Sequence, residues 1–298
     1  MTFLSKGTGY MLLSALWFAL MSLFVKLAGE RLPSQELVLA RAGVTLVLSY
    51  VMLKRRGVSP WGTATQRGWL VVRGLLGFGG LSCFYYGLTA LPLADVTVIH
   101  YLHPVFTALL AAAFLKERVA RGLVLSLIAS SIGVLLVTRP EFLFGAATNA
   151  PDLFAIGAVL LGALFAASAY TVIRYLSRTE EPLVIIFYFP LVAVPLSIPP
   201  LVPVALWPTP WEWVLLILIG VTTQLGQIYL TKGLKEESAG RAMSLSYMQI
   251  VFAALLGLAF FDEVPGLWTL AGSLLIVAGT YVAAIGSRRD ASSRENQP

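Results

Sequence analysis

The sequence predicts an all-α integral membrane protein whose ten transmembrane helices form two five-helix inverted repeats. Three observations lead to this prediction: the composition, the spacing of apolar segments and an internal duplication. Of the 298 residues, 58% are hydrophobic and only 12% are charged, whereas a soluble domain carries about 25% charged residues. Because a lipid bilayer offers no partners to backbone amides, apolar segments of about 20 residues are expected to cross it as helices.

The duplication relates the two halves of the chain. Residues 87–135 align with residues 233–281 at a constant offset of 146 (233 − 87), and no gap is needed. An offset of 148 (157 − 9) aligns the first apolar segment of each half. Equivalent positions include Gly9 and Gly157, Tyr101 and Tyr247, and Glu117 and Glu263. A duplication in such an apolar chain is typical of transporters that bind their solute between the halves.

Five spans are predicted in each half. In the first half they run over residues 8–28, 35–54, 68–90, 94–115 and 122–138. In the second half they run over residues 153–175, 182–203, 212–233, 240–261 and 268–287. Since five is an odd number, the second copy enters the membrane in the opposite orientation, which makes the repeat inverted. We therefore expect one repeat at residues 1–147, a second at 148–287 and a polar cytoplasmic tail at 288–298.

Basic side chains predict the orientation. If the N-terminus lies inside the cell, the segments between spans on the inner side carry most of the lysines and arginines, and those on the outer side carry only Lys26, Arg31 and Arg139. This bias favours a bacterial inner membrane protein with both termini in the cytoplasm. It also accounts for the net charge of +6, so we expect the lipid bilayer, and no nucleic acid, as a partner. A monomer should suffice for function, and a homodimer remains open.

A local match adds a family resemblance. The run Tyr-Leu-His-Pro-Val-Phe-Thr-Ala-Leu-Leu at residues 101–110 closes with Lys-Glu-Arg at 116–118, and its second copy extends from Tyr247 to Glu263. With ten helices, two repeats and both ends inside, the chain resembles the EamA branch of the drug/metabolite transporter superfamily over residues 8–287. The resemblance implies a carrier for small organic solutes, often moved outward.

Polar side chains occupy three equivalent positions in the fourth and ninth predicted spans. These candidates for substrate binding are His100 and Ser246, Tyr101 and Tyr247, and His103 and Gln249. In each span the first and third positions share one helix face, so the two polar stripes would form a central cavity. The alternative is that these groups form hydrogen bonds with neighbouring helices.

Two features of the fourth span bear on mechanism. His100 and His103 are the only histidines, and a histidine that changes charge near neutral pH can couple transport to protons. The alternative is a neutral ring bonded to a neighbouring helix, and no nearby Cys, Asp or Glu completes a metal site. Pro104 cannot donate a backbone hydrogen bond, so it predicts a kink in this span.

Arg41 lies well inside the second span, where a charged group is costly and needs a partner. We expect it to bind the carboxylate of an amino-acid-like substrate, to pair with Glu36, or to reach the outer interface with its long side chain. Its repeat equivalent lies near Tyr188, which is uncharged and is a further substrate-site candidate.

The remaining candidates for the substrate site are aromatic and amide side chains: Trp17, Tyr86, Gln224 and Gln227. They suit a flat or cationic organic solute, although aromatic side chains also pack against lipid. Glu117 and Glu263 close the fourth and ninth spans on opposite membrane faces. We expect them, like Pro104, to have gating or structural roles.

The predicted function is a secondary transporter that moves small organic metabolites, amino-acid-like or drug-like, by alternating access, as an exporter or exchanger. A passive channel and a proton-coupled uptake carrier are the alternatives. The sequence carries no phosphate loop, zinc motif or nucleophile elbow, so we expect no enzymatic activity, cofactor or metal. The first span also lacks the central Glu of small multidrug resistance transporters, which disfavours proton–cation antiport.

Overall fold

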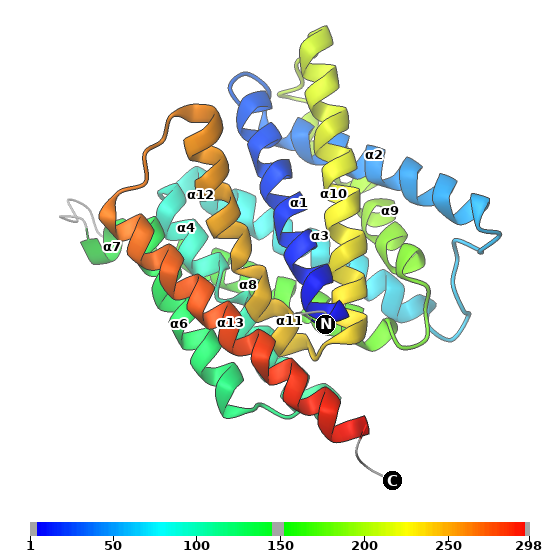
Figure 1. Cartoon of the computed structure of the whole chain (residues 1–298). Helices are drawn as coiled ribbons and strands as arrows, with labels where there is room; N and C mark the ends of the chain where they lie inside the picture. The colour runs from blue at the N-terminus through cyan, green and yellow to red at the C-terminus, as the bar shows by residue number, and fades with distance from the viewer. Residues whose placement is uncertain (1–4, 145–151, 296–298) are drawn as a thin grey trace.

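A computed structural model describes residues 5–144 and 152–295 of the chain. The helices of the first half are α1 (Lys6–Ala28), α2 (Ser34–Arg55), α3 (Arg67–Ala90), α4 (Leu93–His100), α5 (His103–Leu115), α6 (Arg121–Thr138) and α7 (Glu141–Phe144). Those of the second half are α8 (Leu153–Leu176), α9 (Pro182–Leu201), α10 (Pro210–Glu236), α11 (Ala239–Ser246), α12 (Met248–Phe261) and α13 (Leu267–Glu295). Figure 1 shows α1, α10 and α12 crossing the middle of the bundle, with α6 and α13 along one edge and α2 and α9 along the other.

Ten segments of the described chain are long and apolar enough to cross a membrane. This confirms the predicted all-α class and the number of spans. Eight of the segments are single helices, and two are built from helix pairs, α4 with α5 and α11 with α12. The short helix α7 lies just before residues 145–151, which are outside the described residues. Helix α13 continues to Glu295, beyond the predicted end of the last span and into the segment assigned as a polar tail.

The two broken spans are interrupted at equivalent places. The regular α-helix is interrupted at Tyr101–Leu102 in the first half and at Tyr247 in the second, although these residues keep near-helical torsions. The first interruption lies just before Pro104, where the sequence predicts a kink. Pro104 lies in the first turn of α5, where a helix needs no amide donor. The equivalent residue in α12 is Ile250, so a proline is not required for this break.

The helices pack in reciprocal pairs. The most extensive contacts join α1 to α10, α3 to α8, α2 to α9 and α6 to α13. Since α1 corresponds to α8 and α3 to α10 in the duplication, the first two pairs are equivalent, as two related halves require. Gly80 of α3 and Gly162 of α8 face each other so closely that a Cβ atom on either would lie 3.1 Å from the backbone oxygen of the other. Small residues allow such close approach between membrane helices.

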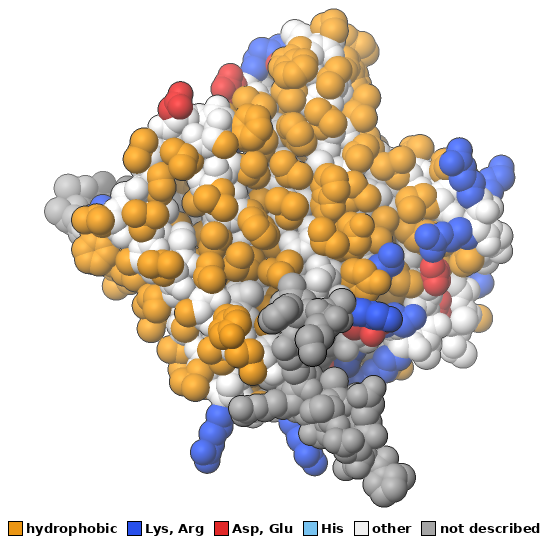
Figure 2. All heavy atoms as spheres, in the orientation of Figure 1, with side chains coloured by type: hydrophobic (Ala, Val, Ile, Leu, Met, Phe, Trp, Pro, Cys, Tyr) orange, Lys and Arg blue, Asp and Glu red, His pale blue; other side chains and the backbone are white. Residues whose placement is uncertain are grey.

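Apolar side chains cover the outside of the bundle. Figure 2 shows hydrophobic side chains over the middle of one face, with charged side chains gathered toward its margins. Phe114 and Leu274 are each at least 70% exposed. An apolar exterior of this extent fits a surface in contact with lipid and not with water.

The bundle has two faces, one at each end of its membrane-spanning helices. At the start of α1, Ser5 donates a hydrogen bond of 2.5 Å to Glu237, which follows α10. Lys26 lies in the last turn of α1, about 30 Å further along the helix at its usual rise per residue. We call the end that holds Ser5 and Glu237 the N-terminal face, and the end that holds Lys26 the opposite face.

Candidate substrate site and gates

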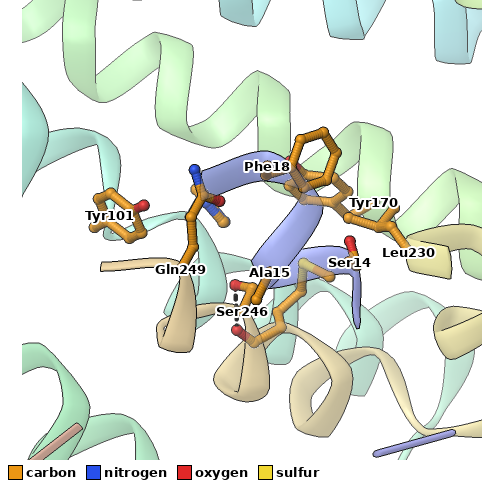
Figure 3. Close-up of a pocket in the computed structure, with 10 residues that line it drawn as sticks. Ser14, Ala15, Phe18, Tyr101, Tyr170, Leu230, Ser246 and Gln249 are labelled. Carbon is orange, nitrogen blue, oxygen red and sulfur yellow. Dashed lines mark hydrogen bonds between the residues drawn. The ribbon is translucent and has the colours of Figure 1, made fainter. Parts of the chain in front are cut away.

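A small cavity lies between the two halves of the chain. Its volume is about 30 Å³, which is room for roughly two water molecules. It is bounded by α1, α5, α8, α10, α11, α12 and the turn between α4 and α5. The lining residues are Ser14, Ala15, Phe18, Tyr101, His103, Tyr170, Leu230, Met243, Ser246 and Gln249 (Figure 3).

Four of the predicted substrate-site residues line this cavity: Tyr101, His103, Ser246 and Gln249. His103 and Gln249 are equivalent positions of the repeat, and each comes from the first turn of a helix that follows a break. The Ser246 hydroxyl group donates to the backbone oxygen of Met243 at 2.6 Å, a bond drawn in Figure 3. Whether these side chains contact a substrate stays a prediction.

Helices α1 and α8 contribute lining residues that were not chosen as candidates. Ser14 and Phe18 are four residues apart on one face of α1, and Tyr170 comes from α8. Trp17, the candidate chosen from α1, is not among the lining residues. The signal was available in part, because a serine and an aromatic residue at a spacing of four share a helix face. Which face of α1 turns inward is decided by packing against α10.

Tyr247 lies beside the cavity and is fully buried. Its ring stacks on the ring of Tyr101, with 5.9 Å between centroids and 25° between planes. Its hydroxyl group donates to the backbone oxygen of Tyr101 at 3.0 Å and lies 3.2 Å from Oγ of Ser131. The two broken spans therefore meet at their break points.

The histidines belong to an aromatic cluster around the first break. The His100 ring lies 4.7 Å from the Phe84 ring and 5.3 Å from the His103 ring. The His103 ring lies 5.2 Å from the Tyr170 ring. Nδ1 of both histidines is buried and has no hydrogen-bond partner among the described residues. His100 itself does not line the cavity.

Three other predicted candidates contact neighbouring helices outside the cavity lining. Gln224 exchanges hydrogen bonds with the Ser49 hydroxyl group, the shorter of which is 3.0 Å. The Tyr188 hydroxyl group donates to the backbone oxygen of Trp61 at 3.1 Å. Tyr86 is 43% exposed and packs edge-on against a phenylalanine of α8. In this conformation these three side chains fit the alternative of packing and hydrogen bonding between helices.

A second polar cluster, formed by Arg41, Arg73 and Gln227, lies outside the cavity lining. It contains an arginine that the sequence reasoning missed. Arg73 of α3 is 3% exposed and donates to Oε1 of Gln227 at 3.3 Å. Its guanidinium group lies 5.0 Å from the Phe189 ring, and that of Arg41 lies 5.8 Å from the same ring. The signal was plain, since Arg73 is a charged residue inside an apolar span. Glu36 accepts a hydrogen bond from the backbone amide of Leu206. Among the described residues it forms no ion pair with Arg41, which was one of the three alternatives for that arginine.

Glu117 closes the N-terminal face with a network that joins both halves. Oε1 of Glu117 accepts from Nε of Arg174 at 2.8 Å, and Oε2 accepts from the backbone amide of Ala239 at 2.7 Å. Arg174 also donates to the backbone oxygens of Leu234 and Lys235, at 2.8 Å each. Glu117 thus caps the start of α11, while Arg174 binds the last carbonyl groups of α10.

Glu263 forms the corresponding ion pair on the opposite face. Its Oε1 accepts from Nζ of Lys26, whose ammonium group also lies 4.0 Å from the centre of the Phe261 ring. The two ion pairs are related by the duplication: Glu117 and Glu263 are 146 residues apart, and Lys26 and Arg174 are 148 apart (174 − 26). The sequence reasoning found both glutamates but not their basic partners, although the second offset already related those two residues.

The two ion pairs differ in burial. The side chains of Arg174 and Glu117 are 16% and 13% exposed, whereas those of Lys26 and Glu263 are 49% and 58% exposed. The first pair also binds backbone groups at two helix ends. The N-terminal face is therefore held by a largely buried, multiply bonded contact, and the opposite face by an exposed one.

Comparison with known proteins places this architecture in a family. The model of the EamA-like transporter family matches residues 5–139 and 153–285. The pseudopaline exporter CntI of Pseudomonas aeruginosa is 35% identical over 92% of this chain and 94% of that protein. Solute carrier family 35 member G1 of Homo sapiens is 33% identical over 94% of this chain and 79% of that protein.

More distant similarities agree. The S-adenosylmethionine uptake transporter of Rickettsia bellii is 27% identical over 97% of both chains. A crystal structure superposes with a TM-score of 0.82 at 21% identity, covering 96% of this chain and 98% of the other, which shows a shared fold. The chain belongs to the EamA-like transporter family and is a multi-pass membrane transporter of small metabolites.

Proposed function

We propose that the protein is a secondary carrier that exports or exchanges a small organic metabolite by alternating access. The observation that carries this proposal is the pair of equivalent ion pairs on opposite faces, one largely buried and one exposed. In a carrier built from inverted repeats, the two halves exchange shapes during the cycle. Equivalent contacts then alternate between a closed and an open form.

The gate residues come from the helices that line the cavity or end beside it. Lys26 is on α1 and Arg174 on α8, while Glu117 follows α5 and Glu263 follows α12. In the present conformation the Arg174–Glu117 pair closes the N-terminal face. In the alternate conformation Lys26–Glu263 becomes the buried pair and the N-terminal face opens. An exported solute enters through that face and leaves through the opposite one when the present conformation returns.

The small volume of the cavity supports a conformational change during transport. At about 30 Å³ the cavity is far too small for an organic metabolite. Substrate entry therefore requires the lining helices to separate. The breaks at Tyr101–Leu102 and Tyr247 give the two gate-bearing helices, α5 and α12, points about which to turn.

Solute counterflow tests the carrier proposal. The purified protein is reconstituted into vesicles loaded with radiolabelled amino acids, nucleosides, organic cations or organic acids in separate preparations. For the transported class, the same unlabelled solute added outside should accelerate exit of the label. Exit that does not respond to external solute would favour a passive channel, and no exit for any class would contradict transport of these solutes.

Direction and location are part of the proposal. Among the relatives, one is named as an exporter and another as an uptake transporter, so family membership leaves direction open. The exporter shares more identity with this chain, and this supports outward movement. The bias of basic residues supports a bacterial inner membrane with both termini in the cytoplasm.

Proton-coupled uptake is the second candidate, and the two histidines favour it. His100 and His103 lie at the first break with unpartnered Nδ1 atoms, where a change of charge would act on the moving element. A proton gradient imposed on vesicles in the absence of a solute gradient separates the two. Solute accumulation driven by protons, lost in His103→Gln, would favour this candidate.

A further inference from the structure

We propose that Arg41 and Arg73 form a buried anion subsite of the transport site, which binds the carboxylate or phosphate group of the transported metabolite. This inference rests on the proposed carrier function and specifies the chemical class of the solute.

The two guanidinium groups have few partners. Nε and Nη1 of Arg73 and Nε of Arg41 are buried and without hydrogen-bond partners among the described residues. The one hydrogen bond that Arg73 makes within the described ranges, to Gln227, is long at 3.3 Å and goes to a neutral oxygen. Within the part of the chain that the structure describes, no carboxylate forms an ion pair with either arginine.

Both groups converge on the same place. They lie 5.0 and 5.8 Å from the centre of the same ring, Phe189 on α9. Two positive charges that share one aromatic neighbour in the interior repel each other. Tyr170 lies within electrostatic range of both. Because three helices, α2, α3 and α9, bring these groups together, the arrangement is a property of the fold and not of one segment.

Two like charges in a low-dielectric interior are unfavourable without a counter-charge. Arginine cannot relieve this by losing its proton. An oxyanion would satisfy the free N–H groups and cancel the repulsion at once. The planar guanidinium fork matches a carboxylate or phosphate through paired hydrogen bonds.

The arginine pair adjoins the central cavity. Tyr170 lines the cavity, its ring lies 5.2 Å from the His103 ring, and both arginines are within electrostatic range of it. Gln227, the partner of Arg73, precedes the cavity-lining Leu230 by three residues on α10, so both share a helix face. In Figure 3, Tyr170 and Leu230 lie at the end of the cavity away from Tyr101.

A solute with an oxyanion at the arginines would therefore extend its remaining atoms past Tyr170 toward His103 and Gln249. This arrangement favours an organic acid or an amino-acid-like metabolite. It disfavours a cationic solute, although the aromatic residues taken alone would suit one.

Four probes of similar size and different charge test the subsite. Thermal unfolding of the purified full-length protein is measured with benzoate, phenyl phosphate, benzamide and benzamidine at equal ionic strength. We expect benzoate or phenyl phosphate to raise the unfolding midpoint in a concentration-dependent way, and benzamide and benzamidine to have little effect. Comparison of the first two probes distinguishes a carboxylate site from a phosphate site.

Variants locate the effect. Arg73→Gln and Arg41→Gln should each weaken binding of the anionic probe by at least about tenfold. Arg73→Lys keeps the charge without the planar fork and should weaken it less. Arg121→Gln, at the exposed start of α6, is the matched control for loss of one positive charge and should leave binding unchanged.

The unfolding midpoint without any probe separates a binding role from a structural one. Removing one of two repelling charges that have no acidic partner should leave this midpoint unchanged or raise it. If Arg73→Gln lowers it while the anion effect persists, the arginine is structural and the proposal fails. If one Gln variant does not fold, the other variant and Arg73→Lys still decide the question.

Two further results would overturn the anion subsite: equal stabilisation by the neutral or cationic probe, or no stabilisation by either anion. Neither result affects the carrier proposal, because counterflow is measured independently and a cationic or neutral solute would still exchange.

Discussion

The hydroxyl group of Tyr247 donates a hydrogen bond of 3.0 Å to the backbone oxygen of Tyr101, its equivalent position in the other repeat. That oxygen is available because the chain breaks after α4, so that the amide of Val105 donates to Leu102 instead. Among the described residues, the reverse bond from the Tyr101 hydroxyl group to Tyr247 is not formed, and the backbone oxygen of Tyr247 accepts from Ile250. The hydrogen bond thus runs only from Tyr247 to Tyr101, although the two tyrosines occupy equivalent positions in the repeat.

The direction of this bond predicts opposite effects for two matched variants. Tyr247→Phe removes a bond of the present conformation and should shift the population away from it by about 1 kcal/mol, or roughly fivefold. Tyr101→Phe should leave this conformation unaffected or enrich it. A cysteine at Ser14 in a Cys83→Ser background reports accessibility of the cavity to an impermeant maleimide from each side. Equal shifts for both variants would contradict a directional contact.

The buried gate should matter more for stability than the exposed one. Glu117→Gln weakens charge-assisted bonds to Arg174 and Ala239, so we expect a loss of about 2 kcal/mol or more in unfolding free energy. Glu263→Gln should cost less than about 1 kcal/mol, because its partner is exposed and screened. Chemical unfolding in mixed micelles measures both. Glu117→Gln should also increase maleimide access from the N-terminal face, and unchanged access would argue against a gate.

Close packing of α3 on α8 predicts a contrast between two glycines of α8. A Cβ atom at Gly162 would lie 2.8 Å from Cβ of Cys83, whereas one at Gly157 would meet nothing within 4 Å. Gly162→Ala should destabilise the protein by about 1–3 kcal/mol, and Gly157→Ala should be neutral or stabilising by up to about 1 kcal/mol. The unfolding midpoints of the two variants test this, and similar values would mean that the helices separate easily.

The cavity lining predicts which glutamine affects binding. Gln249 lines the cavity, so Gln249→Ala should raise the dissociation constant of the substrate by about tenfold if one hydrogen bond is lost. Gln224 pairs with Ser49 away from the lining, so Gln224→Ala should lower the unfolding midpoint and leave affinity unchanged. Direct binding of the solute identified by counterflow provides the measurement. Reversed roles would move the site to the α2–α10 contact.

The charge bias predicts the topology. A reporter that is active only in the cytoplasm should work when it is fused after residue 57 and after residue 298. A reporter that requires export should be inactive at both positions. Activity of the second reporter at either position would contradict the proposed orientation.

Local sequence was sufficient for the number of spans, because each segment must satisfy its backbone and match the bilayer by itself. The duplication also related Tyr101 to Tyr247 and Glu117 to Glu263 before any contact was known. The position of the first break was not predictable in the same way. Pro104 indicated the region of the first break, but the second copy breaks without a proline. No single residue type therefore predicts where these helices are interrupted.

Tertiary structure decided which polar side chains meet. Arg73, Gln227 and Phe189 come from three helices, and only the rotation of each helix about its axis brings them together. The same rotation places Ser14 and Phe18, and not Trp17, in the cavity. Hydropathy determines where a helix lies in the membrane but hardly its rotation, because apolar residues face both the lipid and the neighbouring helices. Rotation is set by close contacts such as Gly80 with Gly162, and these depend on both partners at once.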